Sequence, residues 1–387
     1  MTGCALLLVA AFIAQDQDTS LMKLGPVGIQ PALLLQNVGR DPNVFNSETD
    51  PQSDFTMTIT PKVDVTLRIR RVKTTFNQKV DYVYFKKFAS ERGVNQSYTV
   101  RGDFDLGIFQ PFASASTASS KNRINNEVDE RARYHTNEYF VGTDVHVFTR
   151  TTLSVKARQT DTTFDSNEFF RGESLAAAFN GELRGLDTSV GVALTPLTSL
   201  KVVFTNEQQR FDLEPKRNSD SFRVMPTLVF SPLGLLNGTA GFGYRRFTPT
   251  NPAVPPFDGF VADVSAGITV KDRHRLSTTY TRDVSYSYDS AAVYYVTNSV
   301  GGTWAFTMGR GFDIQLGASR NRMHYHQTVS TGPADDTYSS YDTSFGYHIR
   351  PRLRASINGT FSRRRSQVSA DRAFDSNRVY GTVTWGQ

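Results

Sequence analysis

Few residues of this 387-residue chain have a type and spacing that suggest catalysis or metal binding. His324 and His326 lie two positions apart in MHYH, so on a strand their side chains would share one face. They could begin a metal site or form a surface catalytic pair, but a zinc site needs three or four ligands and nothing nearby completes the set. No GxSxG motif or glycine-rich phosphate loop supports an enzyme. The sequence therefore predicts no catalytic residue, metal or cofactor, and an enzyme that uses the two histidines stays a minor alternative.

Charged residues recur instead at every second position, between apolar and aromatic residues. In the range 97–106, for example, Arg101 and Asp103 alternate with Val100 and Phe104. Side chains on a strand point alternately to its two faces, so this pattern predicts a strand with one charged and one apolar face. So many charges cannot lie in a dry core and must be paired or in contact with water. The main candidates for such a wet inner face are Arg68, Arg70, Arg101, Asp103, Asp105, Lys156, Arg158, Arg275, Arg350, Arg352 and Arg354.

The clearest pair of alternating strands lies at 341–364. Tyr341 and Phe345 belong to an apolar row, and His348 belongs to the polar row that alternates with it. Pro351 interrupts the alternation, which resumes on its far side. Because proline fixes φ and has no N–H to donate, the interruption predicts a tight turn that joins two antiparallel strands. The arginines of this hairpin would then lie near one mouth of a barrel.

Alternation of this kind recurs along most of the chain. A turn is expected at Pro61, and 174–180 is the one segment expected to be helical. Short connections between the strands alternate with longer polar ones, as in barrels with tight periplasmic turns and long external loops. The predicted strands are 29–38, 54–60, 65–70, 97–106, 139–147, 153–158, 188–194, 200–209, 221–230, 239–247, 260–270, 275–286, 293–306, 312–321, 341–350, 353–361 and 378–385.

Composition agrees with a membrane barrel. Mean hydropathy is −0.38, too polar for a bundle of membrane helices, but only every second residue of a barrel strand faces lipid. Aromatic residues make up 12% of the chain, and several, such as Tyr139, Tyr244 and Trp385, lie near predicted strand ends, where interfacial girdles would place them. No repeat of fixed period indicates a propeller. We therefore predict an all-β fold, a transmembrane antiparallel up-and-down β-barrel of about 16–18 strands, with 18 preferred.

The N-terminus resembles a secretory signal peptide. We predict a signal peptide at 1–14, a periplasmic segment at 15–28 and an outer-membrane barrel at 29–387. Cys4, the only cysteine, would be removed by cleavage, so the mature barrel would need no disulfide. The formal charge of +6 comes from 43 basic and 37 acidic residues that are interleaved along the chain, which does not indicate nucleic-acid binding.

A barrel of this size encloses an aqueous lumen, so its charged face predicts a channel that favours polar or anionic solutes. The expected partners are outer-membrane lipid and lipopolysaccharide, the barrel assembly machinery, and a polysaccharide or small anionic solute. The alternative is a closed barrel, braced by salt bridges or plugged by a loop, whose external loops bind a partner.

Five short segments resemble bacterial outer-membrane β-barrel porins linked to exopolysaccharide gene clusters. These segments are RDPNVF (40–45), LTPLTSL (194–200), RFDLEPKRNSDSFR (210–223), FSPLGLLNGTAGFGYRRF (230–247) and TRDVSYSY (281–288). The resemblance runs from about residue 29 to the end and implies a porin-like fold, an outer-membrane location and a link to polysaccharide export. One departure is that Trp385 is followed by Gly386 and Gln387, whereas such barrels usually end on an aromatic residue that the assembly machinery reads.

Overall fold

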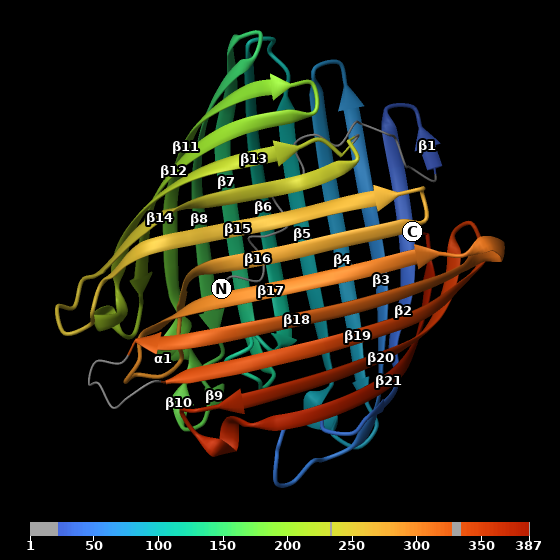
Figure 1. Ribbon diagram of the computed structural model, residues 1–387, viewed down its shortest axis with the longest axis vertical. Helices are drawn as coiled ribbons and strands as arrows, with labels where there is room; N and C mark the ends of the chain where they lie inside the picture. Colours follow the sequence, from blue (N-terminus) through green and yellow to red (C-terminus); the bar gives the residue numbers. More distant parts are fainter. Residues whose placement is uncertain (1–21, 233, 327–333, 387) are drawn as a thin grey trace.

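Strands dominate the protein. The computed structural model describes residues 22–232, 234–326 and 334–386, and 18 of its strands form one antiparallel barrel (Figure 1). These strands are β2 (Val27–Asp41), β3 (Asp54–Ile69), β4 (Val72–Phe85), β5 (Gly93–Phe104), β6 (Phe109–Asn122), β7 (Ala132–Phe148), β8 (Thr151–Phe164), β11 (Gly181–Thr195), β12 (Thr198–Phe211), β13 (Ser219–Phe230), β14 (Leu236–Pro249), β15 (Phe257–Val270), β16 (His274–Tyr286), β17 (Tyr294–Thr307), β18 (Phe312–His326), β19 (Asp335–Arg350), β20 (Leu353–Ser366) and β21 (Phe374–Trp385).

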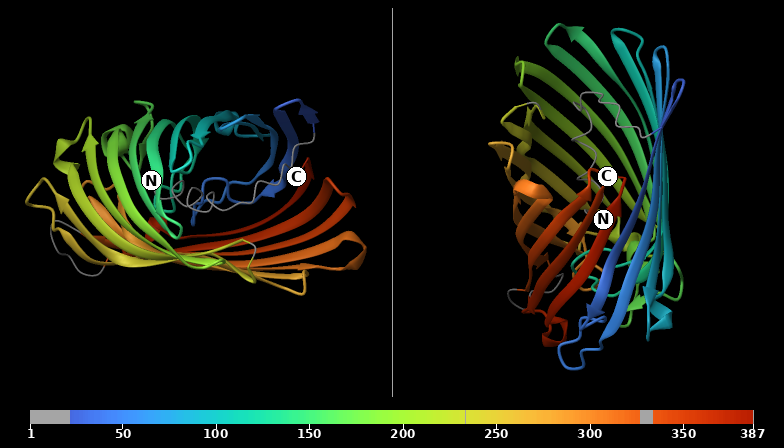
Figure 2. Two further views of the ribbon diagram at one scale, coloured as in Figure 1. Left: turned by 90° about the horizontal axis from the view of Figure 1, so that it is seen from above. Right: turned by 90° about the vertical axis from the view of Figure 1, so that its right-hand side faces the viewer.

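The barrel closes where the last strand pairs with the first. Leu33 of β2 lies opposite Trp385 of β21, and the same Leu33 lies opposite Pro61 of β3 on its other side. β2 therefore has a hydrogen-bonded neighbour on each edge, as a sheet in lipid requires. Seen from above, the barrel is flattened, and its two walls cross steeply because the strands are tilted (Figure 2). The predicted closed barrel and the preferred count of 18 strands are confirmed.

The two ends of the barrel differ. One end carries short turns, such as residues 70–71 between β3 and β4 and 351–352 between β19 and β20. The other end carries longer connections, which include the 3-10 turns Ala89–Glu91, Pro215–Arg217 and Ala370–Arg372. β1 (Met22–Leu24) pairs with β2 at the short-turn end, where β21 also finishes. Short turns face the periplasm in bacterial barrels, so the start of β2 and the end of β21 lie on the periplasmic side.

The outer face is apolar, with aromatic residues near both ends of the strands. Tyr82, Tyr244 and Tyr341 are exposed toward the long-loop end. Trp385 lies at the short-turn end opposite Leu353, in the same outward row as the exposed Val383. Such rings fit the two membrane–water interfaces. No helix in the described ranges is long and apolar enough to cross a membrane.

Some strands and boundaries differ from the sequence prediction. The turn expected at Pro61 is wrong, because β3 runs through it and the missing N–H removes only one possible ladder bond. β4 and β6 are absent from the predicted strands. β6 reads FQPFASASTASSKN, in which alanine and serine alternate with too little hydropathy contrast to show a period of two. The barrel begins at Val27, and the predicted signal peptide lies outside the described residues.

The expected helix is confirmed as α1 (Leu175–Phe179), which lies in the connection between β8 and β11. The Ser174 Oγ accepts a hydrogen bond from the Ala177 N–H at 3.3 Å and caps its first turn. Ahead of the helix, β9 (Phe169–Phe170) and β10 (Glu173–Ser174) form a separate two-stranded hairpin. The whole connection therefore has its own structure and is not an extended loop.

The long-loop ends of β16 and β17 separate from β15. Pairing between β15 and β16 stops at Ala262 opposite Arg282, whereas β16 and β17 stay paired as far as Tyr286 opposite Tyr294. The space between the two layers is filled by an apolar cluster that includes Phe247, whose ring centroid lies 4.9 Å from that of Tyr294. The ends of β16 and β17 are thus covered by the β14–β15 hairpin and lean toward the lumen.

Barrel closure depends on close contact of backbones at Gly39. A Cβ at this position would lie 2.4 Å from the Val379 carbonyl oxygen and 2.9 Å from the Tyr380 Cα, both backbone atoms. Gly39→Ala should therefore destabilise the β2–β21 seam by about 1–3 kcal/mol. The control is Gly191→Ala, whose Cβ would meet nothing nearer than 3.7 Å. Heat-modifiable migration on gels measures the folded fraction, and equal transition temperatures for the two variants would contradict this prediction.

Candidate functional site in the barrel lumen

Arginine–carboxylate pairs define the inner wall. Arg245 on β14 donates from Nη2 to the Glu207 Oε2 on β12 at 3.0 Å and from Nη1 to the Asp283 Oδ1 on β16 at 2.7 Å. Arg223 reaches Asp283 at 3.1 Å, and Arg158 on β8 pairs with Glu207. Side chains of strands that are not neighbours can meet only on the concave side of a barrel. These five residues therefore lie on the lumen face. Because side chains alternate along a strand, they also show which residues of each strand face the lumen and which face lipid.

The wall accommodates the long Arg158 side chain because its neighbour is glycine. A Cβ on Gly185, which lies opposite Arg158 in the β8–β11 ladder, would stand 2.6 Å from the Arg158 Nε. Glycine thus leaves the space in which the guanidinium lies flat along the wall. Two strand positions away, Lys156 pairs with Asp187 of β11 at 2.8 Å. The central wall is therefore a row of paired charges, with both signs available to a solute in the lumen.

The candidate inner-face residues fall at two levels. Arg101 pairs with Asp103 at 2.6 Å and lies over the Phe112 ring at 4.7 Å. Arg354 pairs with Asp313 of β18, also at 2.6 Å. Together with Lys156 and Arg158, these residues lie on the inner wall, in separate pairs along different strands. The structure does not bring them together into one ring.

The other candidates lie at the short-turn mouth. Arg68 is exposed near the end of β3, and Arg275 is exposed near the start of β16. Arg70, Asp105 and Arg352 lie in or beside tight connections. Arg70 has a φ of +51°, and the Asp105 Oδ1 accepts a hydrogen bond from the Gly107 N–H at 3.0 Å. Arg70 and Asp105 therefore lie at the rim, where a turn ends the alternation that suggested an inward face, and Arg352 lies in the turn at the mouth where the hairpin placed it.

Arg350 is also displaced from the inner row. The β19–β20 ladder shifts register between His348 and Arg350, so that Arg350 lies opposite Leu353. Leu353 in turn lies opposite Trp385, in the outward row. A bulge that inserts one residue moves the next side chain to the other face. Arg350 is therefore placed on the outward side of the short-turn rim.

Short turns give this mouth an unpaired basic rim. None of its basic side chains forms an ion pair with a described residue, and all are exposed. Asp105 and Asp272 are the acidic residues of the same turns. The basic residues are Arg70, Arg71, Arg150, Lys271, Arg273 and Arg352. This basic rim contrasts with the paired charges of the central wall.

At the opposite end, the connection between β6 and β7, residues 123–131, reaches into the lumen. Glu127 and Val128 in this connection are fully buried. The Arg364 Nη1 of β20 donates to the Glu127 carbonyl oxygen at 2.9 Å and contacts the Asp129 carboxylate at 3.2 Å. The opposite side of the connection is held by Arg123, whose Nη2 donates to the Val44 carbonyl oxygen at 2.8 Å. β6 and β20 lie on different parts of the wall, so the connection bridges the interior.

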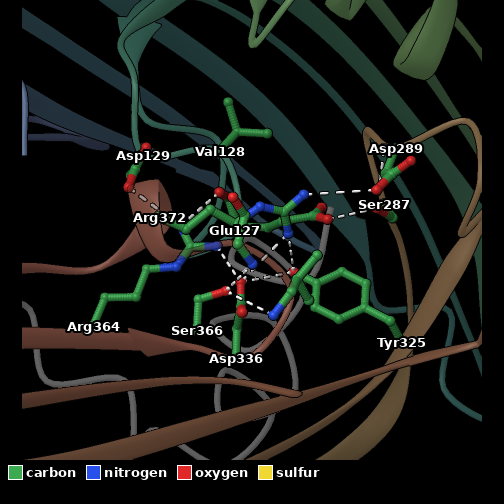
Figure 3. A network of polar contacts seen from close by, with 12 residues as sticks. Glu127, Val128, Asp129, Ser287, Asp289, Tyr325, Asp336, Arg364, Ser366 and Arg372 are labelled. Atoms are coloured by element: carbon green, nitrogen blue, oxygen red, sulfur yellow. Dashed lines mark hydrogen bonds and ion pairs between the residues drawn. The ribbon is translucent and has the colours of Figure 1, made fainter. Parts of the chain in front are cut away.

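A buried polar network holds this bridge in place (Figure 3). Arg364 is fully buried and pairs with Asp336 of β19, which Arg372 also approaches at 3.5 Å. The Glu127 side chain accepts hydrogen bonds from the Ser287 hydroxyl and from the Tyr288 N–H, the latter at 3.2 Å. We call this network the latch; its members are Glu127, Asp129, Ser287, Tyr288, Asp336, Arg364 and Arg372. Because removing one partner of a buried ion pair is costly, the latch is strong while all its members are present.

An apolar cluster adjoins the latch. Val128 packs with Phe170, Leu175 and Phe179 of the β8–β11 connection and with Tyr288 beyond β16. Phe170 and Tyr288 are in edge-to-face contact at 4.7 Å between centroids. The two inward connections thus form an apolar inner layer at the long-loop end and narrow the passage there.

Burial alters the protonation of Glu127. Removal from water raises the pKa of its carboxyl from the usual 4.5 to about 7, although the hydrogen bonds from Ser287 and Tyr288 and the charges of Arg372 and Arg364 act in the opposite direction. The protonated form therefore favours the buried position. This carboxyl links the docking of the 123–131 connection to pH.

The histidine pair has local partners. The His324 Nδ1 lies 2.7 Å from the Asp335 Oδ1, and the His326 ring stacks on Tyr294 at 4.8 Å. Among the residues described, no group of three or more histidine, cysteine, aspartate or glutamate side chains could hold a metal ion. The contacts of these histidines with Asp335 and Tyr294 are structural.

Sequence reasoning missed the latch. Glu127, Asp129 and Arg372 lie in connections, where no period of two reports which way a side chain points. The one available signal was Val128, an apolar residue between two acids in a polar stretch. Glu207 and Arg245 lie on recognised strands, but their pairing across two strands depends on barrel curvature.

Comparison with known proteins finds one matching family and several similar folds over most of the chain. The model of the family described as Putative beta-barrel porin 2 matches residues 21–386. Among solved structures, Pseudomonas aeruginosa OccK2 (OpdF) in complex with glucuronate is similar, with a TM-score of 0.52, 12% identity and coverage of 92% of this chain and 97% of that one. A BenF-like porin from Pseudomonas fluorescens Pf-5 has a TM-score of 0.51, 12% identity and coverage of 92% and 98%. At these identities the likeness shows the fold. No curated protein matches the chain.

Arg364→Gln should release the 123–131 connection. It leaves Asp336 and Asp129 without their main partner, a loss of about 3–5 kcal/mol for a buried pair, so single-channel conductance in planar bilayers should rise. Arg363→Gln is the matched control, because Arg363 is the adjacent residue but points outward, with 48% of its side chain exposed. Equal conductance of both variants and the parent would contradict the assignment of residues 123–131 as the constriction.

Conductance should also depend on pH. Because Glu127 has a raised pKa when buried, docking is favoured while it is protonated and weakens as pH rises from about 4.5 through about 7. Conductance should therefore be larger at pH 8 than at pH 5. Glu127→Gln keeps a neutral side chain in place and should remove most of this difference. A pH response that persists in this variant would show that another group controls it.

Proposed function

This chain belongs to the family described as Putative beta-barrel porin 2, and we propose that it carries polar and anionic solutes through its lumen. It is an outer-membrane β-barrel of the porin type. Residues 1–14 would be the signal peptide that directs export, and residues 15–28 would lead into the barrel. We assign it no chemical reaction.

The basic rim is the observation that carries the proposal. Its guanidinium and ammonium groups surround the periplasmic mouth, outnumber Asp105 and Asp272 of the same turns, and form no ion pair with a described residue. A mouth lined by one sign of charge raises the local concentration of ions of the opposite sign. Anions in the periplasm would therefore be attracted to this opening before they enter the barrel.

The central wall suits the same solutes. A guanidinium can bind a carboxylate with two parallel hydrogen bonds, which gives orientation as well as attraction. Arg101 and Arg354 each hold an aspartate in this way, and Arg158 and Arg245 also bind protein carboxylates along the wall. A passing solute would exchange with these partners one step at a time, with no deep binding site to trap it. Hydroxyl groups of sugars can use both signs of charge.

We infer further that the transported solute is an acidic polysaccharide or its fragments, which would move outward from the periplasm. It is supported by the resemblance to barrels linked to exopolysaccharide gene clusters and by the position of the basic rim on the periplasmic side. A chain of uronate-type residues would meet the rim first and the alternating charges of the wall next. This direction distinguishes export from uptake.

The second candidate is a closed barrel that binds a partner through its external loops. The buried latch and the apolar cluster favour it, because both pack side chains into the long-loop end of the lumen. The two candidates differ in one measurable property. A closed barrel conducts only after the latch is broken, whereas a channel conducts with the latch intact.

Reversal potentials under a salt gradient test the channel. The parent protein should prefer anions. The triple variant Arg71→Gln, Arg150→Gln, Arg352→Gln should lose about half of that preference at 0.1 M salt. At 1 M salt the loss should be much smaller, because the Debye screening length falls from about 10 Å to about 3 Å. The triple variant Arg184→Gln, Arg210→Gln, Arg246→Gln removes the same charge from outward positions at the other end and serves as control. Cation preference of the parent, or equal effects of both triples, would refute the proposed role of the rim.

A further inference from the structure

Four arginines form an exposed patch on the outer face of the barrel, at the long-loop ends of β18 and β20. They lie on the side that faces the membrane, not the lumen. We call them the arginine patch: Arg320, Arg322, Arg363 and Arg365. Side-chain exposure is 59% for Arg322, 48% for Arg363 and 50% for Arg365. Charged side chains on the lipid side of a barrel need a reason.

The strand register places the patch in two rows with a hydroxyl in the middle of each. Ser339 of β19 lies between Arg320 and Arg363, and Thr337 lies between the other two arginines. Neighbouring strands are about 4.8 Å apart, so the backbones that flank each hydroxyl are about 10 Å apart. Because serine and threonine are short, the flanking guanidinium groups border a shallow recess with hydrogen-bond donors on its floor.

The level of the patch is that of lipid headgroups. Two positions closer to the membrane centre, Tyr341 and Phe361 lie opposite each other on the same face, with stacked rings 6.0 Å apart and Tyr341 52% exposed. Aromatic rings of this kind mark the membrane interface. Arg364, between two members of the patch, points the other way and is fully buried. The patch therefore lies just outside the aromatic row, in the external leaflet.

The protein neutralises the patch only in part. Asp375 accepts from Arg363 at 2.9 Å and from Arg365 at 3.1 Å, and Asp335 pairs with Arg322. Arg320 has no hydrogen bond or ion pair to another described side chain. Four guanidinium groups thus face two carboxylates, which leaves a positive surface at headgroup level.

We propose that the arginine patch binds phosphate groups of the outer-leaflet glycolipid, lipopolysaccharide. The guanidinium fork matches phosphate oxygens geometrically, and the Ser339 and Thr337 hydroxyls can donate to the same group. The Tyr341 and Phe361 rings below would contact the first carbons of the acyl chains. This site is separate from the lumen and does not depend on which solute the barrel carries.

Lipid binding by the full-length protein tests the proposal. The purified barrel would be titrated in detergent with lipid A, with lipid A from which the phosphates have been removed, and with inorganic pyrophosphate, and bound lipid would be counted by native mass spectrometry. Arg320→Gln with Arg363→Gln should weaken lipid A binding about tenfold or more, since charge-assisted hydrogen bonds contribute about 1.5–3 kcal/mol each. The control pair is Arg184→Gln with Arg210→Gln, outward arginines that each have a single acidic partner.

The outcomes separate cleanly. Phosphate-dependent binding of lipid A that is lost in the patch variant, with unchanged heat-modifiable migration and conductance, supports the proposal. Equal binding by the patch variant and the control variant overturns it, as does equal binding of dephosphorylated lipid A. Patch-dependent binding of pyrophosphate without lipid A binding also overturns it, because the occupant would then not be a lipid. Unchanged conductance in the patch variant keeps this test independent of the proposed channel function.

Discussion

The structure depends on one constraint, that every backbone N–H and C=O in contact with lipid must be satisfied within the sheet. An open sheet of this size would leave two unpaired edges, each costing several kcal/mol for every exposed polar group. The β2–β21 seam removes both edges. This explains why the seam tolerates irregularity, including a register shift near Gly39, and why backbones approach so closely there. Closure also creates the inside on which the rest of the chemistry depends.

Once the sheet closes, the period of two divides each strand between lipid and lumen. Polar side chains on the inner face remain hydrated or paired, and curvature brings residues of non-neighbouring strands within reach. The Arg245 bridge between Glu207 and Asp283 exists only because β12, β14 and β16 curve toward a common axis. The charges of the central wall are consequently paired and nearly balanced. The unbalanced charge lies in two other places: the basic rim at the periplasmic mouth, and the arginine patch on the outer face at the level of the external headgroups.

The long-loop end obeys a different rule. Its connections leave the sheet, so their polar backbone and side chains need other partners. Residues 123–131 obtain them by crossing the lumen to Arg364, Ser287 and Tyr288. Such a network is stable only while all its members are present, which makes it suited to a two-state constriction that responds to charge.

The sequence by itself determined the class of fold, the preferred count of 18 strands, the two kinds of connection and the helix within 174–180. These features are local: alternation, turn residues and a short apolar run report the conformation of the residues that carry them. It also identified which strand residues are charged, such as Arg101 and Arg158. It misplaced a turn at Pro61 and passed over the alanine–serine strand β6, where local contrast is weak.

Only the tertiary structure decided which charges meet. The Arg364 latch joins residues more than 200 positions apart, and the bulge before Arg350 moves that side chain to the other face. Neither can be read from periodicity, because a connection has no period and a single inserted residue reverses the phase of the residues after it. Alternation assigns a residue to one face of its strand, whereas the curvature and closure of the sheet decide whether that face contacts lipid or the lumen.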